Sequence, residues 1–393
     1  ALWCECTIDK NISVQVLTYF LSGLYLVYRC SLMYLGDTNM SALNPIIGRF
    51  IGSVKEDWVD FMLAHVDPML TVKRVLARVV AIEDETVDIK RFVLKPNKHW
   101  QGFKAGQFVS VKVMINGSFH ERCYSLVNSP TDQVLELGIK RQPNGKVSNW
   151  MHDNLNVGDV IELGDVGGDF VLPQTVPSKL LLIAGGSGVT PIYSILAEAL
   201  KRQADLDVAV VYYVNTDKDL AFANDMVELA VKHPSLKLHY VLASSGAAGR
   251  FSEAQLADVC GDFAQRSTYL CGPQGLMGAV SKVWADKGIS DKLTQEVFGL
   301  PAIDPNKPIS EMPITLRRSQ QLLLNSKPTL LESAEAAGAR PVYGCRIGMC
   351  KTCSCTKVSG VVRDVITGAI DDQPNTQIRI CVTEALSPVT LDI

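Results

Sequence analysis

The spacing of the cysteines near the C-terminus is the feature that most restricts how this chain can fold. Cys345, Cys350 and Cys353 are separated by four and then two residues, and Cys381 follows after a longer interval. Four thiolates with the spacing C-x4-C-x2-C…C hold a plant-type [2Fe-2S] cluster. The fold must therefore bring Cys381, on a distant strand, back to the loop that carries the other three.

Two other interpretations of these cysteines are open. A structural zinc site could use Cys350, Cys353 and Cys355 with a distant fourth ligand, although such sites usually have two C-x2–4-C pairs and this sequence has one. Chance clustering of buried thiols is the second. The iron–sulfur interpretation accounts for four cysteines at once and leaves Cys355 as a packing residue beside the cluster.

The overall composition excludes several classes of protein. The 393 residues include eleven cysteines, an odd number crowded at one end, which argues against a secreted disulfide framework and indicates a metal site in a reducing compartment. The charges are balanced at a net −3, and nothing in them suggests a nucleic-acid partner. The six histidines are scattered and form no ligand pair at helical spacing. At this length we expect two to four domains.

The N-terminal residues are expected to be separate from the folded part. Residues 12–35 are mostly apolar, but Gln15 and Arg29 interrupt them, so they make a marginal membrane-spanning helix. They lack the basic start and the small-residue cleavage site of a secretory signal. The alternative, which we favour, is that translation begins at Met40 and that the preceding residues are not natural protein.

Changes in hydrophobic periodicity divide the remaining chain. A helical pattern over residues 46–70 stops at Asp67-Pro68. Short Val-, Ile- and Phe-rich segments between turns then predict an antiparallel β-barrel, and alternating apolar strands and helical stretches predict an α/β domain on a parallel sheet. The expected boundaries are 1–39 for the doubtful extension, 40–71 for the helical lead-in, 72–177 for the barrel, 178–300 for the α/β domain, 301–311 for a linker and 312–393 for the cysteine domain. The expected strands include 75–82, 88–94, 107–113 and 134–140 in the barrel and 180–184, 208–214, 237–242 and 267–271 in the α/β domain, with helices at 192–202 and 220–232.

Two segments of the barrel region are suited to a flavin. In the run Arg122-Cys123-Tyr124-Ser125-Leu126, the Arg can neutralise a phosphate, the Tyr can pack against the ring system and the Ser can hydrogen-bond a ring nitrogen. Gly145-Lys146-Val147-Ser148 precedes an expected helix, whose N-terminus is suited to a pyrophosphate. The same Arg and Tyr could instead serve packing alone.

Two further segments are suited to a nicotinamide dinucleotide. Gly185-Gly186-Ser187-Gly188-Val189-Thr190-Pro191 follows an apolar strand and opens a helix, which is the context that a dinucleotide-binding turn needs. Cys271-Gly272-Pro273 ends a later strand of the same type, at the edge where parallel sheets bind ligands. A plain glycine-rich turn and a buried packing cysteine are the alternatives.

Taken in order, the segments R-C-Y-S, G-K-V-S, G-G-S-G-V-T-P, C-G-P and C-R-I-G-M-C-K-T-C resemble the ferredoxin–NAD(P)⁺ reductase superfamily. The subgroup they resemble has a plant-type ferredoxin fused at the C-terminus, and the resemblance covers residues 72–393. It implies three domains: an antiparallel β-barrel for the flavin, an α/β parallel-sheet domain for the nucleotide and an α+β β-grasp ferredoxin domain.

The resemblance also assigns the residues. It implies that the flavin is held by Arg122, Tyr124, Ser125, Leu126, Gly145, Lys146, Val147 and Ser148, the nucleotide by Gly186, Gly188, Thr190, Pro191, Cys271, Gly272 and Pro273, and the cluster by Cys345, Cys350, Cys353 and Cys381. The segment Glu296-Val297-Phe298 looks like the family's E-x-F segment, which would place Phe298 near the flavin face. Hydride transfer requires no acid–base or nucleophilic residue, so we name no catalytic one.

We therefore expect an enzyme that passes electrons from NAD(P)H through FAD to the cluster and on to an oxygen-activating iron enzyme. The lead-in is similar to the N-terminal segment of bacterial reductases that serve membrane fatty-acid desaturases and hydroxylases. This similarity implies a diiron, membrane-bound acceptor and a monomeric, cytoplasmic protein that lies at the inner face of the membrane. The reductase of a soluble aromatic-ring or phenylacetyl-type oxygenase is one alternative, and a zinc-bound interaction module on a non-catalytic scaffold is another.

Two cofactor choices stay open at this stage. The pyrophosphate seat favours FAD, whereas the run Arg122–Asn128 is similar to that of FMN-dependent relatives. Asp217 and Asp219 would suit the free ribose of NADH, whereas Lys218 and Arg250 could meet the 2′-phosphate of NADPH.

Overall fold

The computed structural model describes residues 56–299, 309 and 311–393 of the chain. Our expectations for residues 1–39 and for a start at Met40 lie outside these described residues. No helix within the described part is long and apolar enough to cross a membrane.

The chain divides into two compact units, of which the first comprises residues 1–76 and 97–99 and the second contains the rest. The described part of the first unit consists of helix α3 (Glu56–Ala64) and the segment that leads into the barrel. Asp60 of α3 is buried, and its carboxylate accepts hydrogen bonds from the Val72 amide at 2.7 Å and from Arg74 Nε at 2.9 Å. A single charged side chain therefore ties the helix to the segment that follows it.

The lead-in helix ends a few residues before the stop that we expected at Asp67-Pro68. Helix α3 ends at Ala64, and residues 65–70 form turns. Pro68 has no amide hydrogen and disfavours helical geometry at Asp67, whose carboxylate instead accepts a hydrogen bond from the Met69 amide at 2.9 Å. The part of the pattern before residue 56 lies outside the described residues.

The second unit begins with an antiparallel β-barrel, as expected. Its six-stranded sheet has the order β4-β3-β6-β1-β2-β5, and a bridge between Leu126 and Leu137 joins the two end strands. The side chains of β5 alternate, so that Leu135, Leu137 and Ile139 are buried inside the barrel. The strands are β1 (Val75–Asp84), β2 (Ile89–Pro96), β3 (Phe108–Ile115), β4 (Ser118–Ser125), β5 (Leu135–Lys140) and β6 (Val160–Gly167), and helix α4 spans Lys146–Asn154.

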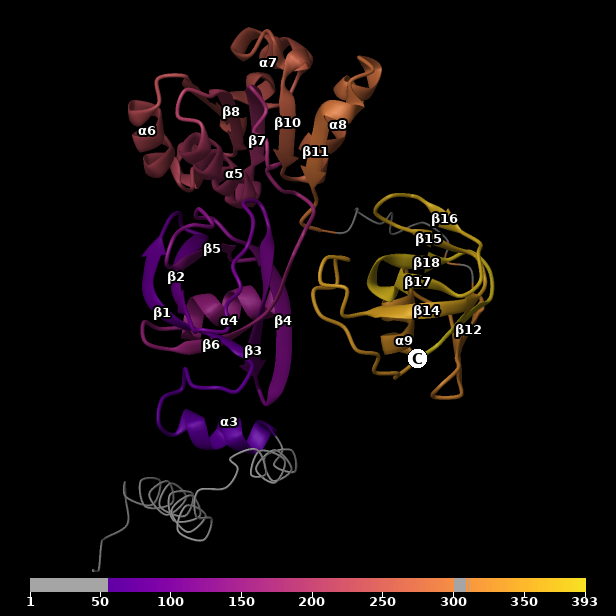
Figure 1. Ribbon diagram of the computed structural model, residues 1–393. Helices are drawn as coiled ribbons and strands as arrows, with labels where there is room; N and C mark the ends of the chain where they lie inside the picture. The colour runs from indigo at the N-terminus through magenta and orange to yellow at the C-terminus, as the bar shows by residue number, and fades with distance from the viewer. Residues whose placement is uncertain (1–55, 300–308, 310) are drawn as a thin grey trace, which may run out of the picture. The chain divides into compact units, whose positions relative to one another are not determined.

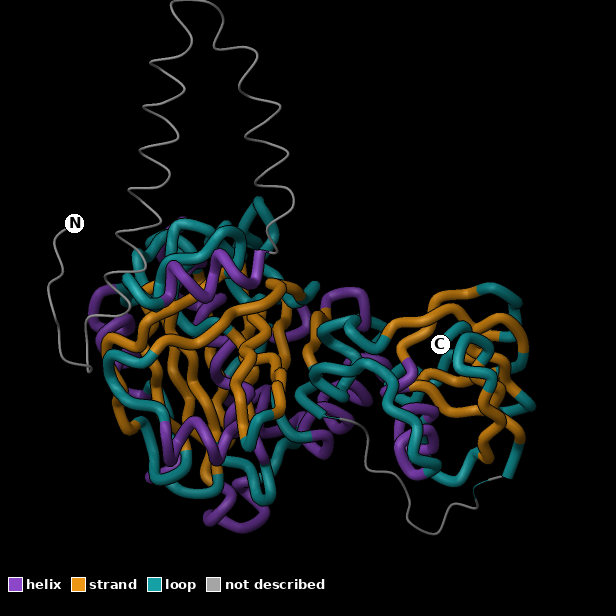
Figure 2. The backbone as a smooth tube through the Cα atoms, turned by 90° about the horizontal axis from the view of Figure 1, so that it is seen from below, coloured by secondary structure: helices purple, strands orange, loops and turns teal. Residues whose placement is uncertain are grey.

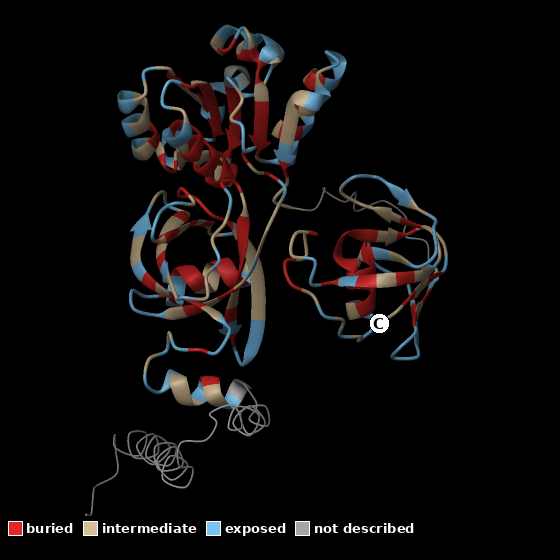
Figure 3. Ribbon diagram, viewed as in Figure 1, coloured by how far each residue is buried: buried red, intermediate tan, exposed pale blue. Residues whose placement is uncertain are grey.

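A five-stranded parallel sheet follows, which confirms the expected α/β domain. Helices α5 and α6 cover one face of the sheet, and α7 and α8 cover the other (Figure 1). Because both faces are covered, the central strands are buried along nearly their whole length, as Figure 3 shows in red. The strands are β7 (Lys179–Gly185), β8 (Asp207–Val214), β9 (Leu236–Leu242), β10 (Ser267–Cys271) and β11 (Leu293–Glu296), and the helices are α5 (Val189–Arg202), α6 (Ala223–Lys232), α7 (Glu253–Val259) and α8 (Gln274–Asp286).

The order of the parallel strands determines where a ligand can bind. The sheet runs β11-β10-β7-β8-β9, so the chain moves outward from β7 in one direction and then returns to place β10 on its other side. In open α/β sheets, ligands bind at such a switch point, beyond the carboxyl ends of the two strands. The turns after β7 and β10 contain the glycine-rich segment and Cys271-Gly272-Pro273.

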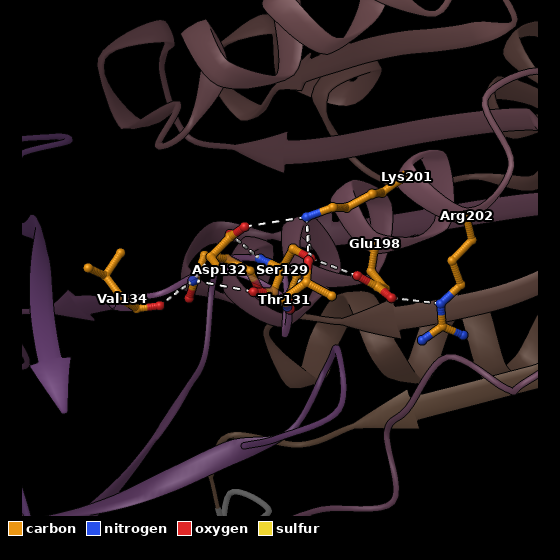
Figure 4. A network of polar contacts seen from close by, with 9 residues as sticks. Ser129, Thr131, Asp132, Val134, Glu198, Lys201 and Arg202 are labelled. Atoms are coloured by element: carbon orange, nitrogen blue, oxygen red, sulfur yellow. Dashed lines mark hydrogen bonds and ion pairs between the residues drawn. The ribbon is translucent and has the colours of Figure 1, made fainter. Parts of the chain in front are cut away.

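Polar contacts join the barrel to helix α5 within the second unit (Figure 4). Ser129 Oγ, in the loop after β4, donates to Glu198 Oε2 on α5 at 2.7 Å. The other carboxylate oxygen of Glu198 accepts from Arg202 Nε at 2.6 Å, and Lys201 lies 3.5 Å from Asp132. Glu198 is buried, so these contacts hold a charge that would be costly to leave unpaired.

The C-terminal domain has the mixed sheet expected of a β-grasp fold. Its larger sheet has the order β13-β12-β19-β14-β17, in which β12 and β19 are parallel. Helix α9 (Leu330–Ala336) packs into its core, and residues 339–352 between α9 and β14 contain no helix or strand. Figure 2 draws all such loops and turns in teal and the strands in orange. The strands are β12 (Pro313–Leu316), β13 (Gln321–Leu324), β14 (Ser354–Ser359), β15 (Val362–Asp364), β16 (Ile370–Asp371), β17 (Thr376–Arg379), β18 (Thr383–Ala385) and β19 (Val389–Leu391).

Candidate flavin, nucleotide and iron–sulfur sites

The fold brings the four cysteines of the C-x4-C-x2-C…C pattern together in two pairs. In the first pair, the amides of Cys350 and Cys345 each donate to the sulfur of the other cysteine, at 3.2 and 3.1 Å. In the second pair, Cys353 Sγ lies 3.1 Å from Cys381 Sγ. Cys381 arrives from the turn after β17, whose strand pairs with β14.

Two pairs of thiols suit a two-iron cluster better than a single metal ion. Among the described residues, no three His, Cys, Asp or Glu side chains lie close enough together to hold one ion. A zinc ion needs four ligands around one centre, whereas each iron of a [2Fe-2S] cluster takes two thiolates and two bridging sulfides. The amides of Met349 and Cys350 both donate to Cys345 Sγ at 3.2 Å, so the loop also supplies hydrogen bonds to a ligand sulfur.

The glycines of this loop lie where the backbone must pass close to other atoms. A Cβ at Gly344 would lie 2.7 Å from Cys350 Sγ, and Gly348 has a positive φ of 79°. Cys355 lies on β14 and is buried in the domain core, where it packs with residues such as Ile378. The buried position of Cys355 agrees with the packing role that we expected from the sequence.

Cys123, which is isolated in the sequence, lies beside the cysteine loop. Its thiol contacts the sulfurs of Cys345 and Cys350, and hydrogen bonding with these two groups raises the pKa of Cys123. The neighbouring Arg122 donates from Nη1 to the Gly344 carbonyl at 3.2 Å and to the Glu121 carbonyl at 2.7 Å. Strand β4 therefore contains both the expected flavin residues and a contact to the cluster loop.

The expected flavin residues lie together at the end of β4. Ser125 and Leu126 are buried, and Tyr124 is half-buried, with the pKa of its hydroxyl raised by burial. Ser125 Oγ has no hydrogen-bond partner among the described residues. A buried hydroxyl without a partner costs free energy, so this one is suited to a ligand atom such as a flavin ring nitrogen.

The expected pyrophosphate seat is the N-terminus of helix α4. Gly145 is the N-cap, and no side chain caps the helix. A Cβ at Gly145 would lie 2.5 Å from Ser148 Oγ, so the space in front of the first turn requires glycine. Val147 and Ser148 are buried, whereas Lys146 is exposed. The uncapped amide groups of the first turn and the Lys146 ammonium group can therefore bind an anion. These features fit the pyrophosphate of FAD.

The turns after β7 and β10 approach each other closely. Gly186 has a positive φ of 51°, and a Cβ there would meet nothing within 4 Å, so its outer side is open. A Cβ at Gly188 would lie 2.2 Å from the Cys271 carbonyl oxygen, and one at Gly185 would lie 2.6 Å from Pro273. Thr190 Oγ1 donates to the Ser187 carbonyl at 3.0 Å and so closes the turn. Pro191, in the first turn of α5, and Gly272, beside Gly185, complete the junction.

Glu296, the first residue of the E-x-F segment, is a functional candidate to which the sequence assigned no role. It lies opposite Cys271 in the β10–β11 pairing and is buried, and its Oε2 atom has no partner among the described residues. Burial raises the pKa of Glu296 to about 8, and burial also raises the pKa of Cys271. Phe298, two residues further on, is partly buried against the core cluster that includes Cys271. The position of Glu296 opposite Cys271 follows only from the pairing of β10 with β11, because the two residues are not neighbours in the sequence.

A cavity of about 520 Å³ extends from the glycine turn along the carboxyl ends of β7, β8 and β9. Asp219 and Arg250 both line it, whereas Asp217 and Lys218 do not. The Asp219 carboxylate accepts hydrogen bonds from the Thr216 amide and hydroxyl, both at 2.9 Å. Four residues were candidates for binding the ribose. Among them, Arg250 both lines the cavity and forms no ion pair with a described residue.

Comparisons with known proteins identify the three domains that contain these sites. The family described as "Oxidoreductase FAD-binding domain" matches residues 76–170, and "Oxidoreductase NAD-binding domain" matches residues 182–282. The family described as "2Fe-2S iron-sulfur cluster binding domain" matches residues 315–386.

Individual relatives span most of the chain. "NADPH oxidoreductase" of Mycobacterium tuberculosis is 28% identical and covers 85% of this chain and 88% of its own length. The "3-ketosteroid-9-alpha-monooxygenase, ferredoxin reductase component" of the same organism is 32% identical over 69% of this chain and 79% of its own. The solved structure of phthalate dioxygenase reductase matches with a TM-score of 0.59 and 25% identity, and covers 81% of this chain and 97% of that chain.

The three domains define an NAD(P)H-dependent oxidoreductase that uses FAD and a [2Fe-2S] cluster. The chain belongs to the ferredoxin–NADP reductase superfamily, in the arrangement that has the 2Fe-2S domain at the C-terminus.

Proposed function

We propose that this protein is the reductase component of an oxygenase system, and that it delivers electrons singly from NADPH to an oxygen-activating iron enzyme. The observation that carries the proposal is the presence, in one chain, of the two thiol pairs Cys345/Cys350 and Cys353/Cys381 with the flavin and nucleotide domains. The names of three relatives support an oxygenase as the acceptor: the ketosteroid monooxygenase reductase component, phthalate dioxygenase reductase and the glycine betaine monooxygenase reductase subunit of Chromohalobacter salexigens.

The residues of each site have separate tasks in this proposal. Arg122 and Lys146 would neutralise the phosphates of FAD, Ser125 would donate to its ring and Tyr124 would pack against it. Gly186, Gly188 and Thr190 would hold the pyrophosphate of the nucleotide, and Phe298 would cover the flavin face until the nicotinamide enters. When bound, FAD supplies the conversion of a two-electron donor into single electrons, and the cluster supplies a one-electron carrier.

Arg250 supports NADPH as the donor. A free ribose is normally bound by an acidic side chain, and the Asp219 carboxylate already caps its own turn, whereas Arg250 can meet a 2′-phosphate. We expect Arg250→Gln to lower kcat/KM for NADPH by roughly tenfold and to leave kcat/KM for NADH nearly unchanged, because only one charge-assisted contact is lost. Equal losses for both nucleotides would contradict this choice of donor.

The first test of the function is an absorbance spectrum before and after anaerobic addition of NADPH or NADH. Flavin peaks with a broad iron–sulfur absorbance, both bleached by the nucleotide, are expected. A colourless protein that contains zinc would refute the proposal. Cys350→Ser should then abolish electron transfer to a protein acceptor while NADPH-to-ferricyanide activity is largely kept, because ferricyanide can take electrons before the cluster. Equal loss of both activities would mean that the cluster is structural.

The identity of the acceptor requires its own experiment. The desaturase interpretation rests on the lead-in alone, and three of the relatives carry the names of oxygenase systems. Purified protein should be mixed with a soluble ring-hydroxylating oxygenase in one assay and with a diiron fatty-acid desaturase in membranes in another. NADPH oxidation coupled to product formation in the first assay only would support the soluble acceptor, and coupling in the second only would restore the desaturase.

A further inference from the structure

A pocket of about 480 Å³, which we call the Arg340 pocket, lies within the C-terminal domain beside the cysteine loop. The residues that line it include Leu316, Arg318, Arg340, Val342, Thr352 and Cys353. Cys353 is the one cluster cysteine among its lining residues. The rate of electron tunnelling falls steeply with distance. An acceptor that docks on a surface close to a ligand thiolate therefore receives electrons fastest.

The Arg340 pocket is positively charged. Its lining contains two arginines, Arg318 and Arg340, and no Asp or Glu. The terminal carboxylate of Ile393 also lines it, and it accepts hydrogen bonds from the Arg318 and Ser319 amides at 2.9 and 3.3 Å, so the arginines outnumber it. Arg340 is exposed and forms no ion pair with any described residue. Asp392 lies nearby, but it accepts from Arg317 at 2.8 Å and from Arg318 at 2.7 Å, so its charge is already balanced. A partner that meets this surface is therefore favoured if it carries carboxylates.

Exposed apolar side chains accompany this charge. Val342, in the pocket lining, is 73% exposed. Leu322, which follows the lining residue Gln321 on strand β13, is 71% exposed. Apolar side chains surrounded by a charged rim are the composition of a protein interface rather than of an ordinary solvated surface.

We propose that the Arg340 pocket is the docking surface for an electron-accepting protein whose own surface carries carboxylates around an apolar side chain. The proposal rests on the proposed function. Each NADPH that is oxidised gives up two electrons and one proton, so two acceptor molecules each take one electron and the proton passes to solvent. Arg340 attracts and orients the acceptor, and Val342 makes the apolar contact that brings it close to Cys353.

The test compares two haem proteins of opposite charge as acceptors. Cytochrome b5 is acidic and cytochrome c is basic, and both take one electron. We expect the second-order rate constant for cytochrome b5 to fall as ionic strength rises and to fall roughly tenfold in Arg340→Glu at low salt. The same variant should reduce cytochrome c faster than the wild type does. The affinity of the oxidised protein for cytochrome b5, measured by calorimetry, should weaken by a similar factor.

Two further variants make the test specific. Lys327→Glu introduces the same change of charge on an exposed residue of the same domain outside the pocket, and it should alter the cytochrome b5 rate less than twofold. Val342→Ser should lower the rate without changing its salt dependence. The visible and electron paramagnetic resonance spectra of all three variants should match the wild type.

The outcomes separate this proposal from the proposed function. If Arg340→Glu and Lys327→Glu have equal effects, or if wild-type protein reduces ferricyanide but neither haem protein, the docking surface is wrong and the reductase function stands. If NADPH does not reduce even ferricyanide, the proposed function itself fails.

Discussion

The buried carboxyl group of Glu296 leads to a quantitative prediction about pH. Its pKa is about 8, because burial penalises the charged form, whereas an ordinary glutamate has a value near 4.5. The folded protein therefore holds a proton that the unfolded chain releases. Each pKa unit corresponds to about 1.36 kcal/mol, so a difference of about 3.5 units stabilises the fold by up to about 5 kcal/mol at low pH.

The sign of this effect follows from the direction of the shift. The stabilisation is fully present below the unfolded pKa near 4.5 and is lost as pH rises through the folded value of about 8. Between pH 6 and pH 8 the nucleotide domain should lose about 2 kcal/mol from this one group. Glu296→Gln keeps the shape of the neutral carboxyl group and cannot ionise, so the variant should not show this loss.

The assay is amide hydrogen exchange of the slowest protons in β7 and β10, which report opening of the nucleotide domain alone. Wild type and Glu296→Gln should be compared at pH 6 and pH 8, saturated with FAD and without nucleotide, after correction for intrinsic exchange. We expect the opening free energy of the wild type to fall by about 2 kcal/mol relative to that of Glu296→Gln between pH 6 and pH 8. Parallel behaviour of the two proteins across this range would refute the assignment of a neutral Glu296.

Two other substitutions test the packing of the domains. Gly188→Ala would place a Cβ 2.2 Å from the Cys271 carbonyl oxygen and should destabilise the nucleotide domain by about 3 kcal/mol, whereas Gly278→Ala in α8, where a Cβ meets nothing within 4 Å, should stabilise it by about 1 kcal/mol. Thermal unfolding of both variants checks this pair, and similar shifts would contradict it. Lys357 is fully buried and donates to the Gly360 and Asp371 carbonyls at 3.0 and 2.8 Å, so Lys357→Ala should cost about 3–5 kcal/mol and Lys357→Met less, because Met keeps the volume of the side-chain stem. Loss of cluster absorbance in urea measures both, and equal midpoints would argue against a role for the stem.

Local patterns were sufficient to predict the three domain types, and the fold brings the four proposed cluster cysteines together. The spacing of Cys345, Cys350 and Cys353 requires one loop to supply three thiols, and the glycine turn after β7 lies directly between a strand and a helix. Both patterns can be recognised in the sequence, because the residues that form each one are close neighbours in the chain. The end of the lead-in helix was predicted less well, because the sequence placed the stop at Asp67-Pro68 and the helix ends before it, at Ala64.

The remaining features depend on residues that are distant in the sequence. The sequence by itself determined the kinds of domain, their order and which thiols we propose as ligands of the irons. Only the tertiary structure placed Glu296 against Cys271, used the charge of Asp219 for a local cap and left Arg250 and Arg340 without ionic partners among the described residues. The physical reason is that burial and pairing depend on strand register and loop position, which set the dielectric and the neighbours of each charge.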